Sequence, residues 1–459
     1  MMRIALPKEV VTACHLLAEH HKQAFVVGGG IRDLILGSFP QDWDLATDAR
    51  PQEVEEIFTR AGFKVIPTGI RFGTVTVFIS GFPVEITTFR VESSYHDFRR
   101  PSKVYFVEGI EEDLARRDFT INALAYDPIR SVFCDPFDGR RDLLKGIIRA
   151  VGDPEERFSE DPLRMMRGVR LAAELGFHLE DRTKHGIVRN AELICRVSAE
   201  RIRDELSRTL LALHFMKGLQ LLTSTGLLFL IIPELREGWL FSQYHPSHQY
   251  PVLEHTLEAM RYTPSSLEVR LAVLLHDIAK PRCFSRGEDG RGHFYGHEKM
   301  GARMAEQILR RLRYNTQMIK RVSVLVREHM LDLKMGPAGM RRLIARVGRD
   351  LIEELLVVRE ADFLAHSREL VLRYLVDFEQ FCEKLRKIIR EENTFEMRDL
   401  AIDGTDVLAV LGCRPGPIVG RILKKLWNEV LDDPARNTRE YLLPRIREIA
   451  EELGWKGDF

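Results

Sequence analysis

The first 150 residues alternate between short apolar runs and amphipathic stretches, which is the pattern of a mixed α/β unit. The run AFVVGG (24–29) predicts a strand that ends in glycines and leads into a helix. A further helix is predicted over 48–62, with Asp48 as its N-cap. Two antiparallel strands are predicted at 74–80 and 84–89, joined by a turn at 81–83.

From about residue 160 onward, apolar residues recur at spacings of three and four, which predicts an almost wholly helical body. A loop rich in glycine, arginine and aromatic residues (283–297) interrupts this pattern. We therefore predict an α+β fold, in which a small mixed α/β head with an antiparallel-containing sheet precedes a long all-α body. The predicted domains are 1–150, 151–240, 241–370 and 371–459.

The composition is that of a globular protein, with 459 residues of which 45% are hydrophobic and 30% charged. Lysine plus arginine (68) equals aspartate plus glutamate (68), which excludes a globally basic nucleic-acid coat but allows a local basic groove. No apolar run reaches the roughly 18 residues of a membrane span, and no secretory signal is evident, so no membrane partner is expected. The six cysteines are scattered without a CxxC pair, which predicts a reduced, cytoplasmic protein.

Two acidic residues alternate after the first predicted helix. Asp42 and Asp44 would face the same side of a strand. Carboxylates this close repel each other unless a cation lies between them, and oxygen ligands at this spacing suit Mg²⁺. Glu85, in the strand predicted at 84–89, can supply a third carboxylate. The alternative is an ordinary solvated strand edge, because acidic residues are common in turns.

A glycine turn precedes these acidic residues. Gly28, Gly29 and Gly30 lie between the first predicted strand and helix, and Arg32 follows within one turn. Glycines let backbone N–H groups approach a phosphate, and a helix N-terminus adds partial positive charge. The turn alone is a weak signal, but with Arg32 and the two aspartates it predicts a site for a phosphate and a metal ion.

A row of charged residues repeats every three positions where the helical body begins. Asp161, Arg164, Arg167 and Arg170 form this row, which on a helix would stay near one face. It is either the salt-bridged solvent side of an amphipathic helix or a set of groups that recognises a ligand. The residues by themselves favour the first interpretation slightly.

The body also carries histidines beside aspartates. Imidazole nitrogens and carboxylates together suit a transition metal. The chain has 15 histidines, and a lone helical histidine is more often a core or surface residue. An adjacent His-Asp pair with an upstream histidine and a downstream aspartate is more specific. The residues of this pattern are His255, His276, Asp277 and Asp362, and His297 and His329 are further histidines of the same region.

A series of motifs occurs in the order found in one enzyme family. The segment 28–47 resembles the head motif of the class II tRNA nucleotidyltransferases, which include CCA-adding enzymes, and of the bacterial poly(A) polymerases. The later motifs resemble the same family and extend the similarity over nearly the whole chain. They are RRDFTINALAYD (116–127), DPFDGRRDL (135–143), EDPLRMMRGVRLAAELGF (160–177), ERIRDEL (200–206) and DGTDVLAVLGCRPGPIVGRILKKL (403–426).

The resemblance implies template-independent, Mg²⁺-dependent addition of CCA to the 3′ end of tRNA, with CTP and ATP as substrates. Asp42 and Asp44 would then be catalytic metal ligands, and Glu85 would hold the third-carboxylate position. CTP and ATP present an amine donor beside a ring-nitrogen acceptor, which an aspartate beside an arginine can match. The implied nucleotide-binding residues are Gly28, Gly29, Arg32, Arg117, Asp161, Arg164, Arg167 and Arg170, with Glu160 as a further possibility.

The exact product stays open between CCA, A-only, CC-only and poly(A). The stretch 90–106 lies where the family has a flexible loop, and its full length favours an enzyme that adds the terminal A. An ordinary mobile surface loop is the alternative. The tail (371–459) is expected to bind tRNA, and no oligomeric state is predicted. Basic runs at 310–313, 320–321 and 424–425 are either phosphate contacts or solvated helix faces.

The histidine pattern resembles the HD phosphohydrolase domain, which several bacterial nucleotidyltransferases of this class carry after the head. On that resemblance His255, His276, Asp277 and Asp362 would bind Ni²⁺, Co²⁺ or Mn²⁺, and His297 and His329 are candidates for a second metal or for phosphate binding. The domain either hydrolyses phosphate esters or 2′,3′-cyclic phosphates, or it is a retained scaffold that helps to hold tRNA. A protein whose main activity is this hydrolysis is the remaining enzymatic alternative, and the intact head motifs oppose it.

Overall fold

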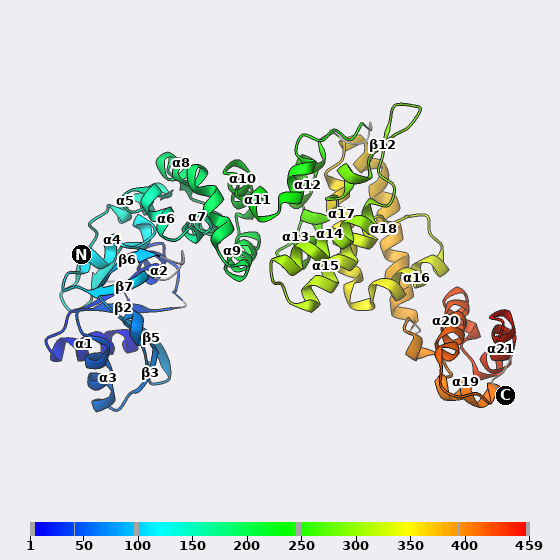
Figure 1. Cartoon of the computed structure of the whole chain (residues 1–459), viewed down its shortest axis with the longest axis horizontal. Coiled ribbons are helices and arrows are strands. Elements are labelled where there is room, and N and C mark those ends of the chain that lie inside the picture. Colours follow the sequence, from blue (N-terminus) through cyan, green and yellow to red (C-terminus); the bar gives the residue numbers. More distant parts are fainter. Residues whose placement is uncertain (1–4, 41, 96–100, 245–248, 393–394, 456–459) are drawn as a thin grey trace. The chain divides into compact units, whose positions relative to one another are not determined.

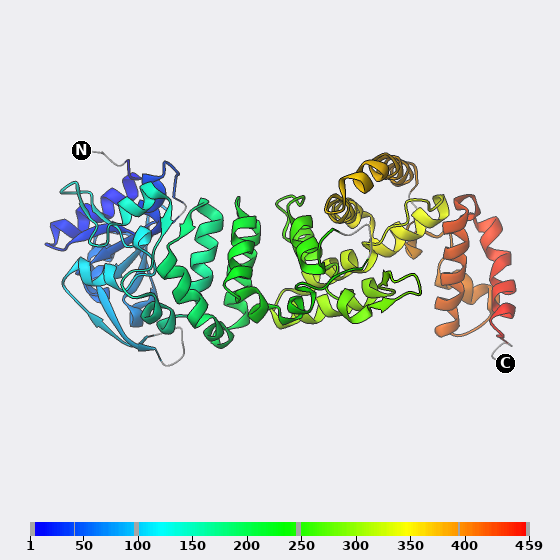
Figure 2. The same ribbon diagram turned by 90° about the horizontal axis from the view of Figure 1, so that it is seen from above.

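The computed structural model describes residues 5–40, 42–95, 101–244, 249–392 and 395–455. The chain divides into two compact units, Met1–Pro233 and Glu234–Phe459 (Figures 1 and 2). The first contains a mixed sheet and then helices, and the described part of the second is helical apart from one short hairpin. The predicted α+β fold with a helical body is therefore confirmed. None of the helices in the described ranges combines the length and the apolar character needed to cross a bilayer.

A seven-stranded sheet forms the centre of the head. Its strands are β1 (Ala24–Val27), β2 (Asp44–Thr47), β3 (Lys64–Gly69), β4 (Thr74–Ile79), β5 (Phe82–Thr88), β8 (Ala125–Asp127) and β9 (Val132–Cys134). They lie in the order β3-β4-β5-β2-β1-β8-β9. The pair β2–β5 is parallel and the other neighbours are antiparallel. All four residues of β1 are buried, which explains why that strand reads as a continuous apolar run.

Helices α1 (Lys8–Glu19) and α3 (Pro51–Arg60) pack against this sheet and against each other (Figure 1). The apolar residues of α1 recur at helical spacing and are buried, as expected for an amphipathic helix on a sheet. Because side chains alternate along a strand, Phe25 and Val27 of β1 share one buried cluster. Ile110 and Leu114 of α4 (Ile110–Ala115) complete that cluster.

Two local predictions differ from the structure. The hairpin between β4 and β5 turns at Ser80 and Gly81, whose φ angles are 52° and 84°, and Phe82 already pairs with Ile79. Positive φ at both positions is typical of the two-residue turns that match strand twist. Helix α3 begins at Pro51, whereas Asp48 accepts a hydrogen bond from the Gln23 N–H at 2.8 Å. Asp48 therefore ties the end of β2 to the start of β1 instead of capping the helix.

The stretch predicted as the family's flexible loop contains an antiparallel hairpin of β6 (Arg90–Tyr95) and β7 (Pro101–Phe106). The middle of that stretch, 96–100, lies outside the described residues. Whether this segment contributes to addition of A stays a prediction.

Further helices complete the first unit, and of these α2 lies between β1 and β2 while the others follow the last strand of the seven-stranded sheet. They are α2 (Gly29–Ile35), α5 (Gly139–Lys145), α6 (Pro154–Glu160), α7 (Leu163–Leu175), α8 (Asp181–Asn190), α9 (Ala199–Leu211), α10 (Phe215–Ser224) and α11 (Leu227–Ile231). Helices α7, α9 and α10 pack against one another. The buried face of α7 includes Met165, Met166, Val169 and Ala172, so this helix is anchored by an apolar side while its charged residues contact other segments.

The second unit contains two groups of helices. The first group is α12 (Val252–Met260), α13 (Leu267–Leu275), α14 (His297–Arg311), α15 (Thr316–Glu328), α16 (Pro337–Val347), α17 (Ile352–Leu364) and α18 (Arg368–Glu391). The last three helices are α19 (Gly404–Leu411), α20 (Pro417–Asp432) and α21 (Arg439–Glu452), coloured orange to red in Figure 2. They share a hydrophobic core of their own, which includes Val407, Leu426 and Ile446.

Candidate functional site

The head site begins at the turn between β1 and α2. Gly28 has φ +73°, a conformation that side chains rarely adopt. A Cβ at this position would lie 2.9 Å from Arg117 Nη1 and 3.7 Å from Asp44 Oδ2. Glycine is thus needed both for the backbone conformation and for the close approach of an arginine and an aspartate. Gly29 is the first residue of α2 and has Arg32 as its nearest side-chain neighbour.

Asp42, Asp44 and Glu85, which we call the head carboxylates, lie where β2 and β5 run side by side. Asp44 is directly opposite Glu85 in the parallel pair, and the Glu85 N–H donates to the Trp43 carbonyl at 3.1 Å. Asp42 lies two residues before β2 and is exposed, as is Glu85, whereas Trp43 between the two aspartates is buried. The predicted alternation of exposed and buried side chains therefore begins before β2, at Asp42.

The electrostatic surroundings of Asp44 differ from those of an ordinary exposed aspartate. Burial raises the pKa of Asp44 to about 6, Arg117 opposes that rise, and the nearby Glu85 and Asp42 add to it. The charges that act most strongly on Asp44 are thus one arginine and two other carboxylates. An all-oxygen ligand set of this kind fits a hard divalent cation such as Mg²⁺.

The predicted nucleotide-binding arginines of the head are partly engaged by the protein. Arg32 donates from Nη1 to Asn122 Oδ1 at 2.8 Å and pairs with Asp33 through Nη2 at 2.7 Å. Arg117 Nη2 lies 3.3 Å from Asp113 Oδ2, and its buried Nε has no hydrogen-bond partner among the described residues. Arg117 therefore retains an unused donor next to the glycine turn.

The row of charges where the body begins is not carried by one helix. Asp161 lies between α6 and α7 in an extended conformation, and its Oδ2 accepts a hydrogen bond from Arg201 Nη2 of α9 at 2.8 Å. Arg164 is the second residue of α7, and it donates to Glu160 Oε2 at 2.8 Å and to the Arg116 carbonyl at 3.0 Å. The aspartate and the arginine thus each have a partner outside the pair.

The last two arginines of the row have different surroundings. Arg167 Nη2 lies 2.9 Å from Asp118 Oδ2, next to Arg117 in the chain. Arg170 lies between Glu174 and Glu205, at 2.6 Å from each. Burial by itself would lower the pKa of Arg170, but the two glutamates outweigh burial and raise it. The structure brings Arg164 and Arg167 to the 116–118 segment, and it engages Arg170 in a structural ion pair.

In the second unit, three histidines of the predicted metal cluster are oriented by the backbone. His276, His297 and His329 each donate from Nδ1 to the carbonyl oxygen three residues earlier, at 2.7, 2.8 and 2.7 Å. This bond fixes the tautomer and leaves Nε2 as the atom that can bind a metal. The same local geometry therefore prepares three ligands that are far apart in the sequence.

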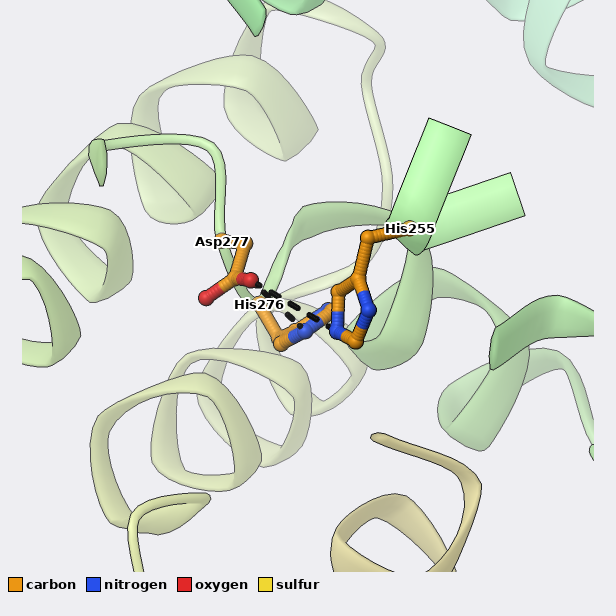
Figure 3. Close-up of side chains that lie close together, drawn as sticks. All are labelled: His255, His276 and Asp277. Atoms are coloured by element: carbon orange, nitrogen blue, oxygen red, sulfur yellow. Dashed lines mark ion pairs between the residues drawn. The ribbon is translucent and has the colours of Figure 1, made fainter. Parts of the chain in front are cut away.

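Asp277 lies at the centre of this group. His276 Nε2 is 3.2 Å and His255 Nε2 is 3.9 Å from Asp277 Oδ2, as Figure 3 shows. His297 Nε2 and His329 Nε2 lie 3.4 and 3.8 Å from Asp277 Oδ1. Two sets of ligand atoms, each within 4.8 Å, thus share Asp277. We call these five residues together with Asp362 the histidine cluster.

Asp362 joins the cluster from α17. Its Oδ1 lies 2.9 Å from His255 Nε2, and its Oδ2 is 2.7 Å from Arg359 Nη1. His366 forms a third potential metal-binding set with His255 and Asp362. On the other side, Lys280 Nζ lies 2.6 Å from Asp277 Oδ2. Each of the two buried aspartates therefore has a cationic side chain of the protein beside it.

The histidine cluster is buried, with its six members between 0% and 5% exposed. Burial would raise the pKa of Asp277, but His276 and Lys280 hold it well below the usual range. Burial would lower the pKa of His276, but Asp277 and Asp362 raise it to about 10. His276 Nε2 has no hydrogen bond within the described chain despite its burial. Converging ring nitrogens and carboxylates with such an unsatisfied atom fit a transition metal.

The basic runs of the body are largely paired with acidic residues. Arg310 contacts Glu306 at 2.6 Å, Arg311 contacts Glu234 at 2.7 Å, and Lys425 contacts Glu452 at 2.9 Å. Arg321 contacts three carboxylates, those of Glu268, Asp350 and Glu354. At these four positions the basic side chains form salt bridges with acidic residues of the protein. This geometry is that of solvated helix faces, which was the alternative to phosphate contacts.

Comparison with known proteins identifies the family. The chain is 36% identical over 429 residues to the CCA-adding enzyme of Lactobacillus helveticus (strain DPC 4571), covering 93% of each chain. It is 32% identical to the CCA-adding enzyme of Enterococcus faecalis (strain ATCC 700802 / V583), covering 96% of this chain and 97% of the other.

The chain belongs to the CCA-adding enzyme family. It is therefore an enzyme of the nucleotidyltransferase class, as the motifs predicted. Models of the poly A polymerase head domain, the probable RNA- and SrmB-binding site of polymerase A, and the HD domain match residues 24–149, 176–238 and 247–367. The predicted resemblance to nucleotidyltransferases with an HD domain is confirmed.

The family's known structures share the fold. The crystal structure of the Bacillus stearothermophilus CCA-adding enzyme in complex with CTP matches with a TM-score of 0.70 and 28% identity, over 97% of this chain and 98% of that chain. Nucleotidyltransferase and HD families generally use divalent metals, and the chain has residue groups able to hold them.

Sequence reasoning for this family member missed several residues that complete the sites. Arg201, Asn122 and Asp118 lie inside the quoted motifs 200–206 and 116–127, so the motifs contained the signal although no role was attached to these positions. His366 follows Asp362 by four residues, one helical turn, and that spacing was the available signal.

Proposed function

We propose that this chain adds nucleotides to the 3′ end of tRNA, using CTP and ATP, to complete the CCA terminus. The head carboxylates carry the proposal. Asp44 lies opposite Glu85 on neighbouring strands, and burial, Glu85 and Asp42 all raise the pKa of Asp44. The names of the relatives and the CTP complex of the Bacillus stearothermophilus enzyme support it.

The reaction is an in-line attack of a tRNA 3′-hydroxyl on the α-phosphate of CTP or ATP, with pyrophosphate as the leaving group. Mg²⁺, when bound by Asp42 and Asp44 with Glu85 beside them, supplies charge neutralisation and activation of the hydroxyl. Around the Gly28–Gly29 turn, Arg32 and the guanidinium of Arg117, whose Nη1 lies beside Gly28, hold the triphosphate.

Base choice is assigned to Asp161 and Arg164, with Arg167 beside them and Glu160 positioning Arg164. Their hydrogen-bonding groups match the amine and ring nitrogen that cytosine and adenine share, and oppose the carbonyl and N–H of uracil and guanine. To bind a base in this way, Asp161 exchanges its bond with Arg201 for one with the nucleotide. Arg170 supports α7 through Glu174 and Glu205 and acts on the nucleotide indirectly.

We assign one role to each of the four predicted domains. Nucleotidyl transfer is assigned to 1–150, nucleotide selection to 151–240, the histidine cluster to 241–370 and tRNA binding to the tail, 371–459. The separate hydrophobic core of α19–α21 supports a distinct tail. The free cysteines and the tRNA substrate support the cytoplasm as the site of action.

Incorporation of labelled CTP and ATP into three tRNAs tests this function. The substrates end before CCA, after C and after CC. We expect CTP to extend the first two and ATP to extend the third, with growth stopping at CCA. Failure to extend any of them would contradict the proposal. Extension with C alone, with A alone, or without a stop would replace it by a CC-adding, A-adding or poly(A)-forming activity.

A second candidate function is phosphoester hydrolysis at the histidine cluster. The buried, unsatisfied Nε2 of His276 beside Asp277 favours it, because such an atom in a mixed nitrogen and oxygen ligand set fits Ni²⁺, Co²⁺ or Mn²⁺. We expect the wild type, but not His276→Ala, to hydrolyse a phosphodiester or 2′,3′-cyclic phosphate with one of these ions. Equal hydrolysis by both proteins, or none by either, would leave the cluster as a scaffold.

A further inference from the structure

A continuous set of polar contacts runs from α2 to α7 through the 118–122 segment. It begins at Arg32, assigned above to the triphosphate, and ends at Arg167, assigned to the nucleotide-selecting region. Asn122 stands in its middle, in a short 3₁₀ turn (Thr120–Asn122), and is only 7% exposed. None of the roles proposed so far uses this amide.

Asn122 uses both ends of its amide in this set. Its Oδ1 accepts from Arg32 Nη1 at 2.8 Å, and its Nδ2 donates to Asp118 Oδ1 at 3.1 Å. An amide can accept from an arginine through its oxygen and donate to a carboxylate through its nitrogen at the same time. Both bonds involve a charged partner, which makes them stronger than bonds between neutral groups.

Asp118 continues the connection to α7. It is 7% exposed, accepts from the Phe119 N–H through Oδ1 at 2.8 Å, and lies 2.9 Å from Arg167 through Oδ2. Burial would raise the pKa of Asp118, but Arg167 and the Asn122 hydrogen bond hold it below the ordinary value. Asp118 is therefore a buried anion that depends on both neighbours.

The segment that carries these two residues has little freedom to shift. Phe119 is fully buried, and a Cβ on Gly168 of α7 would lie 2.9 Å from its ring. Thr120 Oγ1 donates to Asp142 at 2.7 Å. A close-packed segment of this kind transmits the position of one contact to the next.

We propose that Asn122 is a positioning residue that ties the triphosphate-binding Arg32 to the nucleotide-selecting helix α7, so that phosphate and base are held in one fixed geometry. The inference rests on the proposed function. Loss of the amide leaves Arg32 held by Asp33 alone and leaves Asp118 with fewer donors, which shifts Arg167. Nucleotide binding and base choice then weaken together, although Asn122 touches neither the base nor the phosphates.

A mutant cycle tests this role in the full-length enzyme. We compare kcat/KM for CTP in Arg32→Ala, Arg167→Ala and the double variant, in the wild-type and Asn122→Ala backgrounds. We expect the two arginine effects to be non-additive in the first background and additive in the second. We also expect Asn122→Ala to raise KM for CTP and ATP about tenfold, to increase UTP incorporation, and to leave KM for tRNA unchanged.

Two further variants keep the test decisive. Asn122→Asp keeps the shape and the acceptor for Arg32 but replaces the donor to Asp118 by a second carboxylate, so it should lose the coupling between the arginines. Asn190→Ala is the control, because that amide donates to the Gly186 carbonyl within α8. If the coupling survives both Asn122 variants, or if they match Asn190→Ala in KM and UTP use, the inference is wrong.

The same assay separates this inference from the proposed function. A wild type that extends no tRNA with CTP or ATP would refute the proposed function itself. If the wild type is active but the non-additivity between Arg32→Ala and Arg167→Ala does not change when Asn122 is replaced, only the positioning role is refuted. Thermal unfolding of each variant shows whether it is folded. If Asn122→Ala does not fold, the coupling is measured in Asn122→Asp instead.

Discussion

The head carboxylates and the histidine cluster are both suited to divalent cations, but their surroundings are opposite. In the head, Asp42 and Glu85 are exposed, and Arg117 is the cation that most affects the half-buried Asp44. In the cluster, every member is buried, and the two aspartates are contacted by Lys280 and Arg359 of the chain itself. The head site is therefore partly exposed and has one dominant neighbouring cation, whereas the histidine cluster is buried and each of its aspartates has a cationic side chain beside it.

We propose that this difference keeps two metal sites of one chain chemically separate. Uncompensated oxygen ligands favour a hard cation that arrives with a phosphate substrate, whereas preset imidazole nitrogens favour a transition metal. The backbone bonds to Nδ1 of His276, His297 and His329 preset the cluster without a metal. We therefore expect the head, and not the cluster, to carry an electrostatic cost when no cation is bound.

The largest expected effect separates the two sites by activity. Asp42→Ala should reduce nucleotide addition to less than about a thousandth of the wild-type rate, because it removes a ligand of the cation at the reacting phosphate. Hydrolysis and metal binding at the histidine cluster should not change. The measurement is tRNA extension with labelled CTP beside metal content after dialysis. Substantial remaining extension would remove the metal-ligand role.

The reverse change should affect only the cluster. We expect His276→Ala to weaken binding of Ni²⁺, Co²⁺ or Mn²⁺ there about a hundredfold, because Nε2 is a central ligand atom. Extension of tRNA should stay within about twofold of wild type. Calorimetric titration with each ion measures the loss, and His185→Ala, at an exposed position of the first unit, is the control. An equal loss in both variants would contradict the assignment.

Replacement of Asp161 tests base choice without disturbing either cation site. Asp161→Ala removes the acceptor that opposes uracil and guanine, so discrimination against UTP or GTP should fall by about 10- to 100-fold. Competition between CTP and UTP for a tRNA that ends before CCA measures the ratio of kcat/KM values. Unchanged selectivity would leave the charged row as a salt-bridged helix face.

The smallest expected effect is on stability, and it concerns Asp44. Its pKa is about 6 in the folded protein against the ordinary 3.8, so the folded state binds this proton more tightly. The stability contributed by this group is full below pH 4 and is lost as the pH rises through 6. Without divalent cations, Asp44→Asn should therefore unfold less readily than wild type at pH 8, by up to about 3 kcal/mol, and similarly at pH 4.

Urea unfolding at both pH values measures this difference. Asp204→Asn, at a side chain that is 63% exposed on α9, is the matched control and should behave like wild type. Addition of Mg²⁺ at pH 8 should stabilise the wild type more than Asp44→Asn. A destabilised Asp44→Asn protein at pH 8 would show that the head carboxylates are satisfied without a cation.

The sequence allowed the local part of both sites to be predicted. Alternation placed Asp42 and Asp44 on one side, and the apolar pattern at 84–89 placed Glu85 on a strand. Helical spacing could not reveal that Asp161 lies outside α7, because Pro162 permits both a helix start and a break. The Asp48 cap was wrong because a long-range bond to Gln23 competes with local capping.

Long-range partners were beyond the reach of periodicity. Arg201 and Asp161 are 40 positions apart, and Arg32 and Asn122 are 90 apart, so only the fold brings them together. The cluster was easier, because the His276-Asp277 pair comes with an upstream histidine and a downstream aspartate in helical segments. Arg359 and Asp362 lie three residues apart on α17, a spacing that marks partners on a helix, whereas Lys280 reaches Asp277 from the turn that follows α13.

Mn²⁺ binding followed by electron paramagnetic resonance, in the presence of CTP, tests the central claim most directly. The His276→Ala background removes the contribution of the histidine cluster and leaves the head. We predict that Asp42→Asn and Asp44→Asn each weaken the remaining Mn²⁺ binding at least about tenfold in that background. Equal Mn²⁺ affinity with and without these carboxylates would contradict the claim that the head carboxylates bind the cation.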